Sequence, residues 1–406
     1  MKVFYDERYT AAEYDFDTTR KSAVVAAAVA GMENVELVSP RAVTSRELGL
    51  VHDPKYVRSV RTGKGPSRGA FFWDPGLWTA VSTSTGGAVD AALTALEEGI
   101  SGSLSSGLHH ARSTGGAGFC TFNGLALAAK MALGHRPRGF RNRKRAHKCK
   151  RVLILDMDAH CGGGTHSLIK DDPRIWQIDI SVCFFDSYKS KSERHHLHIL
   201  TDPSDYLGIL EVELERAAEI GFDLVIYNAG MDPHEDCGIG GLNGISSEVL
   251  RLRDKFVFDW AREQGIPIAF VLAGGYTGRF MWEERLAALH ATTIAVAAGA
   301  PLPDLEAIEA DPPTVKTIFE LCEQRWLEVL DEVEASELPW EEELERELLN
   351  DLGLYAEPWD EYMEEEDDGS YVPEGTRVYN SIHELPQDFF EIENEELREQ
   401  YPEFFH

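Results

Sequence analysis

Short apolar runs alternate with amphipathic stretches along the first three quarters of the chain. Six runs have the length and composition of buried strands, at residues 2–5, 35–38, 152–155, 176–180, 224–227 and 266–272. The stretches between them are rich in good helix formers and predict helices at residues 21–30, 87–96, 124–133, 206–220 and 246–264. Apolar strands that alternate with amphipathic helices predict an α/β domain, in which helices cover both faces of a mainly parallel sheet.

The charge of the chain is concentrated in its last quarter. Of the net charge of −31, residues 301–406 contribute −29, from 34 acidic and five basic side chains, and residues 1–300 contribute −2. A salt-adapted protein would spread its acidity over the whole surface. We therefore predict a folded domain over residues 1–333, closed by a helix over residues 315–330. An acidic, aromatic-containing extension would follow over residues 334–406, partly helical and otherwise extended or disordered.

One internal segment carries the opposite charge. Nine of the sixteen residues from 136 to 151 are Lys or Arg, which predicts an exposed basic loop inserted in the domain. Such a loop can be a solvated surface, a docking site for the chain's own acidic extension, or a contact for nucleic acid. The acidic extension would correspondingly dock on this loop or on a basic partner.

The composition is that of a soluble globular protein. Hydrophobic residues make up 43% of the chain, no uncharged apolar run reaches about 18 residues, and the first residues lack the apolar segment of a signal peptide. We therefore expect no membrane span and a cytoplasmic location. The six cysteines have no CxxC spacing, which argues against a disulfide framework and against a thiolate zinc site.

The most informative stretch follows the predicted strand at residues 152–155 and reads RVLILDMDAHCGGGTH. Alternate side chains of a strand share one face, so Asp156, Asp158 and His160 should project together where the strand leaves the sheet. Carboxylate and imidazole are ligands that zinc accepts, and the glycines that follow allow the backbone to approach closely. Taken alone, the stretch could equally be a strand end followed by a glycine turn with solvated acids.

Three other segments place chemically capable residues after apolar or glycine-rich stretches. They contain His109 and His110, Asp232 and His234, and Tyr276. Because the chemistry of a parallel α/β sheet sits at the carboxyl ends of its strands, these residues should meet the Asp and His residues of the metal stretch at one rim. There, carboxylates and an imidazole could hold zinc, a neighbouring imidazole could accept a proton, and a tyrosine hydroxyl could donate to an oxyanion.

This ordered set resembles the zinc-dependent histone deacetylase family, including its bacterial acetylpolyamine amidohydrolase and acetoin-utilisation relatives. The motifs SGLHHA, GFCTFN, DMDAHCGGGT, NAGMDPHED and GGY stand in the family's order within residues 2–330. The resemblance implies a three-layer α/β/α fold of the arginase/deacetylase type. It also implies zinc-dependent hydrolysis of an acyl amide, chiefly an acetyl amide, on a lysine side chain or a small amine.

The resemblance further implies a role for each polar residue. Asp158, His160 and Asp232 would ligate Zn²⁺. His109 would be an electrostatic helper held by Asp156, and a K⁺ ion is expected nearby, bound partly through Asp156.

The remaining roles concern proton transfer and the substrate. His110 would be the general base and later the general acid, and Tyr276 would polarise the amide carbonyl. Gly118 and Phe119 would contact the substrate, Phe119 as one wall of a tunnel for the acyl-amine chain. The opposite wall would be a phenylalanine at position 184 or 185.

Several positions depart from the family's pattern. Cys161 stands where the family usually has a second His, Gly124 follows Asn123 where a second Asn is usual, and a HisPro rim motif near the N-terminus is missing. The most consequential departure is Gly163, where the family has an Asp or Asn that orients His110. Without that partner we expect a lower pKa for His110 and a freer ring, and we expect Gly163→Asp to raise that pKa.

Two other classes of function compete with the deacetylase interpretation. An arginase-like binuclear manganese hydrolase shares the expected fold, but it would need an Asp two residues after His160, where Gly162 stands. A catalytically weak module that binds acyl-lysine or recruits partners through its charged segments is the non-enzymatic alternative. The sequence leaves the substrate open between protein lysines, small acetylated amines and a biosynthetic intermediate.

Overall fold

The computed structural model describes residues 1–12, 17–63, 75–137, 149–190, 192–278 and 280–309. Within these ranges, eight strands form one sheet in which all neighbours are parallel. The strands are β1 (Lys2–Phe4), β2 (Glu36–Val38), β3 (Ile100–Ser103), β4 (Val152–Asp156), β5 (Ile175–Ser181), β6 (His195–Ile199), β7 (Leu224–Ala229) and β8 (Ile268–Leu272). Their order in the sheet is β2-β1-β3-β8-β7-β4-β5-β6.

The central strands are buried because their side chains are apolar on both faces. Every residue of β4 and of β7 is buried. Successive side chains of a strand point to opposite faces, so Leu153 and Leu155 join one core while Val152 and Ile154 join a second core. A sheet with two apolar faces needs a layer of helices on each of them.

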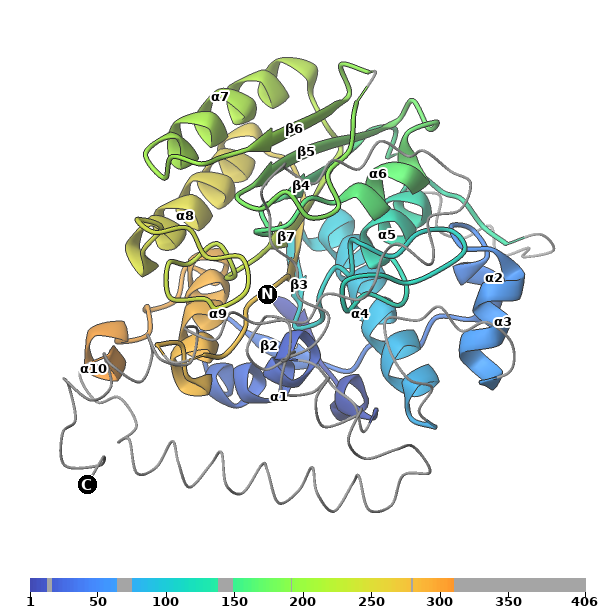
Figure 1. The fold of residues 1–406 in the computed structure, drawn as a ribbon, viewed down its shortest axis with the longest axis horizontal. Coiled ribbons are helices and arrows are strands. Elements are labelled where there is room, and N and C mark those ends of the chain that lie inside the picture. The colour runs from blue at the N-terminus through green and yellow to red at the C-terminus, as the bar shows by residue number, and fades with distance from the viewer. Residues whose placement is uncertain (13–16, 64–74, 138–148, 191, 279, 310–406) are drawn as a thin grey trace, which may run out of the picture. The chain divides into compact units, whose positions relative to one another are not determined.

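Helices cover both faces of the sheet, as Figure 1 shows. One core contains side chains of α1 (Asp17–Val29), α7 (Asp205–Ile220), α8 (Ser247–Gln264) and α9 (Glu283–Ala298). The other contains side chains of α2 (Ser45–Leu48), α3 (Pro54–Thr62), α4 (Leu77–Glu98), α5 (Gly124–Ala132) and α6 (Gly163–Ile169). A 3-10 helix (Glu7–Thr10) and α10 (Leu305–Glu309) are the other described helices. The predicted three-layer α/β/α architecture with a parallel sheet is therefore confirmed.

All six predicted strands and all five predicted helices are present, with shifted ends. The largest shift is in α4, which begins at Leu77 rather than near residue 87. The sequence pattern missed β3, β6 and α9, together with the short helices α2, α3, α6 and α10 and the 3-10 helix. None of the helices among the described residues is both long and apolar enough to cross a membrane.

Some sequence predictions fall on other parts of the chain. The closing helix over residues 315–330, the boundary at residue 333 and the acidic extension over residues 334–406 lie outside the described residues and stay predictions. The same holds for residues 138–148 of the basic segment. At its described ends, Arg136 donates to the carbonyl oxygen of Met131 at 2.8 Å, and the backbone N–H of Arg151 donates to the Asp223 carboxylate at 2.9 Å.

A buried ion pair of α8 packs against the carboxyl end of β7. Arg253 and Asp254 of α8 form this pair, and neither side chain is exposed. Arg253 also donates to the carbonyl oxygen of Gly230 at 2.5 Å, just after β7. Asp254 accepts hydrogen bonds from the hydroxyls of Tyr227 and Thr293, at 2.5 and 2.6 Å. The pair thus links β7, α8 and α9, and each charge depends on the other because neither reaches water.

We predict that Arg253→Leu lowers the free energy of unfolding by about 3–5 kcal/mol, because it leaves the Asp254 carboxylate buried without a cation. The matched control is Arg251→Leu on the same helix. Arg251 pairs with Glu248, but the side chains are 28% and 60% exposed, so this loss should cost only about 0–1 kcal/mol. Urea unfolding of the two variants measures the difference, and equal destabilisation would contradict the prediction.

Candidate functional site

The loops after four neighbouring strands carry the candidate site residues. β3, β8, β7 and β4 lie side by side in the sheet, and their carboxyl ends share one edge (Figure 1). In chain order, these loops contribute His109 and His110 after β3, Asp158 and His160 after β4, Asp232 after β7 and Tyr276 after β8. The predicted convergence at one rim is what the topology produces, since ligand sites of parallel sheets form at carboxyl ends of strands.

Asp158, His160 and Asp232 form a buried group of potential metal ligands. Nδ1 of His160 lies 3.1 Å from Oδ1 of Asp158 and 3.2 Å from Oδ2 of Asp232. One donor atom from each residue lies within 4.8 Å of the others, and the residues are 3%, 8% and 0% exposed. Two carboxylates and one imidazole are a donor set that Zn²⁺ accepts, with a position left for water or substrate. The residues selected from the sequence as ligands therefore meet at one point and fit a single zinc ion.

The backbone around this group fixes the two carboxylates. The N–H of Gly274, just after β8, donates to Oδ2 of Asp158 at 2.7 Å, and the N–H of Ala159 donates to Oδ1 of Asp232 at 3.0 Å. A Cβ at position 274 would lie 2.0 Å from Oδ2 of Asp232. Only glycine lets the backbone after β8 come this close, so the GGY motif shapes the site as well as supplying a tyrosine.

His109 is held in place from the end of β4. Its Nδ1 lies 2.9 Å from Oδ2 of Asp156, and Oδ1 of Asp156 accepts a hydrogen bond from the Asn228 side chain at 2.7 Å. Asp156 and Asn228 are direct neighbours in the register of β4 and β7. The contact expected between His109 and Asp156 is present, and Asn228 is a supporting residue that the sequence analysis did not single out.

His110 has a carboxylate partner that sequence reasoning missed. Its Nδ1 lies 3.0 Å from Oδ2 of Asp186. Asp186 also accepts from the backbone N–H of Gly164 at 2.9 Å and forms an ion pair with Arg112. The side chain of Asp186 is only 6% exposed, and its backbone adopts φ 57°, a left-handed conformation that Asp tolerates better than most residues. The loop after β5 is therefore shaped to deliver this carboxylate to His110.

The expectation that Gly163 leaves His110 without an acidic partner is wrong. A Cβ at position 163 would lie 2.3 Å from the backbone oxygen of Asp186 and 2.5 Å from its Oδ1. Asp186 thus occupies the space that a side chain at position 163 would need. Glycine at position 163 and the carboxylate at position 186 form one arrangement, in which the partner of His110 comes from another loop.

The charges around the histidine pair decide which ring carries the extra proton. Nε2 of His109 and Nε2 of His110 are 3.0 Å apart, so one donates and the other accepts. Burial alone would lower the pKa of His109, but Asp156 and Asp158 outweigh it and raise that pKa to about 10. Burial and the charge of His109 lower the pKa of His110 to about 4, against the opposing effect of Asp186. His109 therefore donates from both ring nitrogens, while His110 donates through Nδ1 and accepts the His109 hydrogen bond with the lone pair on its Nε2.

Aromatic residues flank this group. The ring centroids of Phe119 and Tyr276 are 5.9 Å apart, and Phe185 lies edge-on to His110 with its centroid at 4.9 Å. Phe184 instead is 41% exposed, so Phe185 is the phenylalanine that faces the site. Burial and the two aspartate ligands raise the pKa of Tyr276 well above its ordinary value, so its hydroxyl keeps its proton.

The glycine-rich segment GGAGFCTFN adapts the backbone to these rings. Gly118 has φ 48°, and a Cβ there would lie 2.4 Å from Cδ2 of His110 and 2.9 Å from the Phe185 ring. Phe119 follows with φ 61°, a strained conformation for an aromatic residue. Strain of this kind is retained where the surrounding structure fixes a functional side chain, here the ring of Phe119 beside Tyr276.

Not every residue singled out in the sequence belongs to the site. Nε2 of His234 lies 3.0 Å from the Ser247 hydroxyl, and its Nδ1 accepts from the backbone N–H of Asp236 at 3.0 Å. His234 therefore stabilises the turn after Asp232. Asn123 of GFCTFN is fully buried and donates to the carbonyl oxygen of His109 at 3.1 Å, which supports the histidine loop without contacting the ligand group.

A further buried carboxylate lies next to Asp156, on the neighbouring strand. Asp179 of β5 is directly opposite Asp156 in the strand register, and both are 0% exposed. Burial and the charge of Asp156 raise the pKa of Asp179 well above its ordinary value. It accepts hydrogen bonds from Gly162 N–H at 2.7 Å and from the Ser181 hydroxyl at 2.6 Å. Two carboxylates buried side by side favour a bound proton or a cation between them.

Comparison with known proteins shows which family the chain is similar to. A family model described as the histone deacetylase domain matches residues 15–292. An uncharacterized protein of Picosynechococcus is 33% identical over 236 residues, which cover 56% of this chain and 75% of the relative. Histone deacetylase 2 of Arabidopsis thaliana is 29% identical over 261 residues, 60% of this chain and 64% of the relative.

A solved structure agrees with the fold. The acetylpolyamine aminohydrolase of Burkholderia pseudomallei superposes with a TM-score of 0.58 at 16% identity, over 73% of this chain and 98% of that chain. At this identity the likeness concerns the fold alone, which is of the arginase/deacetylase type. Because the family model covers more than half of the sequence, the chain belongs to the histone deacetylase family.

Proposed function

We propose that the protein is a zinc-dependent deacylase that hydrolyses an acyl amide, chiefly an acetyl amide, on a lysine side chain or a small amine. The observation that carries the proposal is the buried group of Asp158, His160 and Asp232, with His110 and Tyr276 beside it. Family membership supports deacylation in general, and the donor set supports zinc. A zinc ion held there would act as a Lewis acid, lowering the pKa of a water molecule and polarising the acyl carbonyl.

His110 is the residue we assign to proton transfer. Its Nε2 is unprotonated while neighbouring His109 stays protonated, so His110 is the member of the pair that can act as a base. His110 accepts a proton from the attacking water and then donates it to the departing amine. The Asp186 contact at Nδ1 orients the ring and places the unprotonated nitrogen at Nε2.

The other residues stabilise charge and position the substrate. The Tyr276 hydroxyl, which keeps its proton, donates a hydrogen bond to the carbonyl oxygen as negative charge develops there. The imidazolium of His109, held by Asp156, adds positive charge near the same atoms. Phe119, with Gly118 before it, and Phe185 flank the approach and suit the unbranched methylene chain of a lysine or an aliphatic amine.

We also propose a K⁺ ion beside the catalytic group. Asp156 and Asp179 are buried and adjacent, and a monovalent cation between them would offset their repulsion. Such an ion would hold the carboxyl end of β4, just before Asp158 and His160.

A single-metal site is favoured over an arginase-like pair of metals. Gly162 stands where the bridging carboxylate would be needed, and a Cβ at that position would lie 2.7 Å from Oδ2 of Asp156 and 2.8 Å from the Gln177 amide. A carboxylate side chain therefore does not fit at position 162 without displacing both neighbours.

We predict that the full-length chain releases acetate from an acetyl-lysine amide or from N-acetylputrescine, that a chelator stops this, and that zinc restores it. Acetate and free amine are quantified, and a wider acyl-amine panel ranks the substrates. Restoration by two manganese ions per chain, but not by zinc, would favour the arginase-like alternative. A chain that holds zinc yet turns over no acyl amine would favour a binding module.

A further inference from the structure

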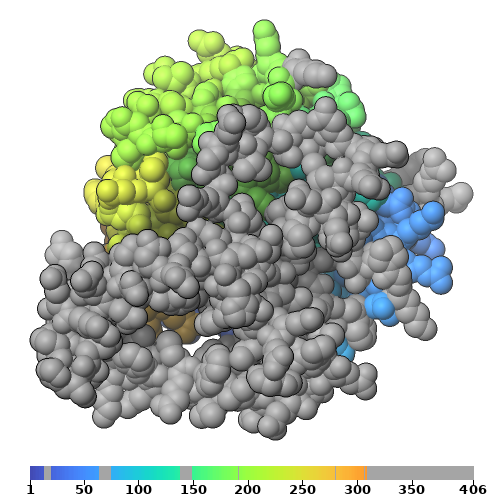
Figure 2. All heavy atoms as spheres, viewed as in Figure 1, coloured from blue at the N-terminus to red at the C-terminus, as the bar shows by residue number. Residues whose placement is uncertain are grey.

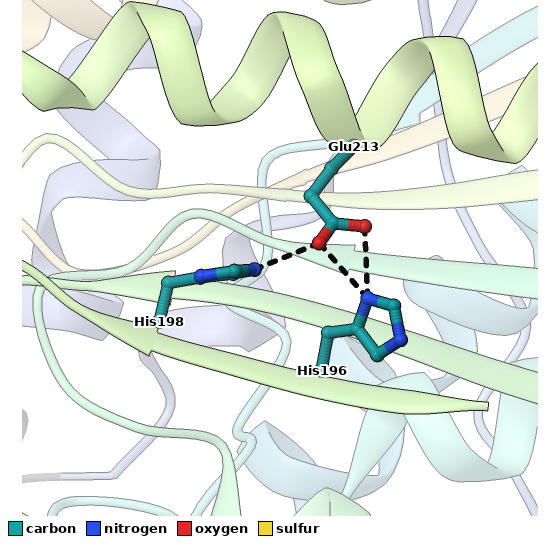
Figure 3. Close-up of side chains that lie close together, drawn as sticks. All are labelled: His196, His198 and Glu213. Atoms are coloured by element: carbon teal, nitrogen blue, oxygen red, sulfur yellow. Dashed lines mark hydrogen bonds and ion pairs between the residues drawn. The ribbon is translucent and has the colours of Figure 1, made fainter. Parts of the chain in front are cut away.

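Three potential ligands meet on the sheet, away from the catalytic group. β6 is an edge strand, and its alternate residues His196 and His198 point toward α7, from which Glu213 reaches down to them (Figure 3). Nε2 of His198 lies 2.8 Å from Oε1 of Glu213, and Nδ1 of His196 lies 2.9 Å from each Glu213 oxygen. Ligand atoms of all three residues lie within 4.8 Å of one another.

We propose that His196, His198 and Glu213 form a second metal site, which binds a divalent ion of the zinc class and joins edge strand β6 to α7. Two imidazoles and one carboxylate are a set of ligands that zinc uses. Ligands at about 2.0–2.1 Å from a tetrahedral ion lie roughly 3.3 Å apart. The imidazole–carboxylate distances of 2.8 and 2.9 Å would therefore lengthen by a few tenths of an ångström, and the two imidazole nitrogens lie within 4.8 Å of each other. The inference does not depend on the proposed deacylase function.

With Glu213 ionised, Nδ1 of His196 has two contacts that ask for opposite roles of this atom. Contacts between its Nδ1 and the Glu213 oxygens require a hydrogen on Nδ1, because a carboxylate only accepts. The same Nδ1 lies 3.1 Å from Nη1 of Arg216, which only donates and therefore requires a lone pair there. A cation held by the Nδ1 lone pair and by Glu213 is compatible with these side-chain positions once Arg216, which is exposed, turns to solvent.

Burial suits a bound ion with one water ligand. The side chain of Glu213 is 6% exposed, that of His196 17% and that of His198 32%. The α7 region lies at the molecular surface, at the top of Figure 2. Because His196 and His198 are partly exposed, an ion can enter from solvent and keep a water as its fourth ligand.

The site would stabilise an edge of the sheet. A three-ligand bridge holds β6 against the helix that covers it, where a strand has a hydrogen-bonded neighbour on only one side. Because β5 separates β6 from β4, the bridge is distinct from the catalytic group.

The test measures the number of zinc ions bound per chain, on the full chain after any affinity tag is removed. Metal-stripped protein is dialysed against zinc chloride and bound zinc is measured. We expect two zinc ions per chain in the unaltered protein, one in His198→Ala and one in Asp232→Ala, with deacylase activity retained in His198→Ala. A single ion that His198→Ala removes would support this site while contradicting zinc at the catalytic group.

Two further variants make the result specific. His135 is the matched control, because it pairs with Asp172 at 3.3 Å without belonging to a described group of three ligands; His135→Gln should leave the zinc count unchanged. Arg216→Gln removes a competing cation and should tighten binding at this site by roughly tenfold. The proposal is overturned if His198→Ala binds as much zinc as the unaltered chain, or if zinc binds only where Asp232→Ala abolishes it.

Discussion

Asp232→Ala should remove bound zinc from the catalytic group and reduce kcat/KM by more than about 10³-fold. The reason is that Asp232 supplies one of only three protein donors there and is fully buried, so no neighbouring side chain can replace it by moving in from solvent. Loss of a single hydrogen-bond donor to the oxyanion already lowers the rate about 10²–10³-fold. Loss of the metal should lower it further. Zinc content and steady-state kinetics of the same preparation measure the two effects together.

Tyr276→Phe is the matched control for this prediction. It removes only the hydroxyl that we assign to the carbonyl oxygen, so activity should fall by about 10²–10³-fold while bound zinc stays unchanged. If Asp232→Ala has normal zinc content and normal activity, Asp232 is not a zinc ligand. Equal zinc loss in both variants would show that Tyr276 acts on the metal group rather than on the substrate.

The parts of the fold that could be predicted are those in which local sequence and tertiary environment agree. β4 and β7 are continuous apolar runs because both of their faces are buried, and their polar residues begin where each strand leaves the sheet. The same coincidence of strand end and polar residue allowed the ligand group to be located, since Asp158 and His160 follow β4 directly.

The strands that were missed lack this agreement. β3 reads ISGS, and its Gly102 is packed so closely on Phe270 that a Cβ would lie 2.1 Å from the ring. Its small polar residues are set by tertiary packing rather than by strand propensity. β6 reads HHLHI, in which two of the histidines face Glu213, so an apolar pattern never forms.

Asp186 could not be found from the sequence because nothing local marks it. It lies 76 positions from His110, in a loop after β5 that carries no metal motif, and only the folded chain brings the two together. The signal that was available is indirect. Gly163 lacks the expected side chain. A missing side chain has two explanations: another segment fills the space, or the function is lost.

Asp186 acts on His110 in two physical ways. Its Oδ2 accepts the Nδ1 hydrogen, which orients the ring and places the lone pair on Nε2. Its charge also stabilises the imidazolium that would form when Nε2 takes a proton, and so raises the pKa of His110 against the effects of burial and His109. Arg112 and the Gly164 N–H hold the carboxylate in position.

Gly163→Asp is accordingly expected to damage the site rather than improve it. The new Cβ would collide with the backbone oxygen of Asp186, 2.3 Å away, and backbone cannot give way as a flexible side chain can. The variant should lose activity and thermal stability together. A fully stable, more active Gly163→Asp enzyme would contradict the arrangement described for Gly163 and Asp186.

The sharper experiment is Asp186→Asn, which keeps the shape of the side chain and removes its charge. We expect kcat/KM at the pH optimum to fall on the order of 10²-fold, within the range of general acid–base contributions. The imidazolium loses stabilisation, so the pKa of His110 falls further and the acidic limb of the kcat/KM profile moves to lower pH. The matched control is Asp172→Asn, where an aspartate likewise contacts a histidine and an arginine, His135 and Arg174, at the surface. That change should leave the limb in place. An unmoved limb in zinc-loaded Asp186→Asn, or an equal movement in both variants, would show that Asp186 does not set the basicity of His110.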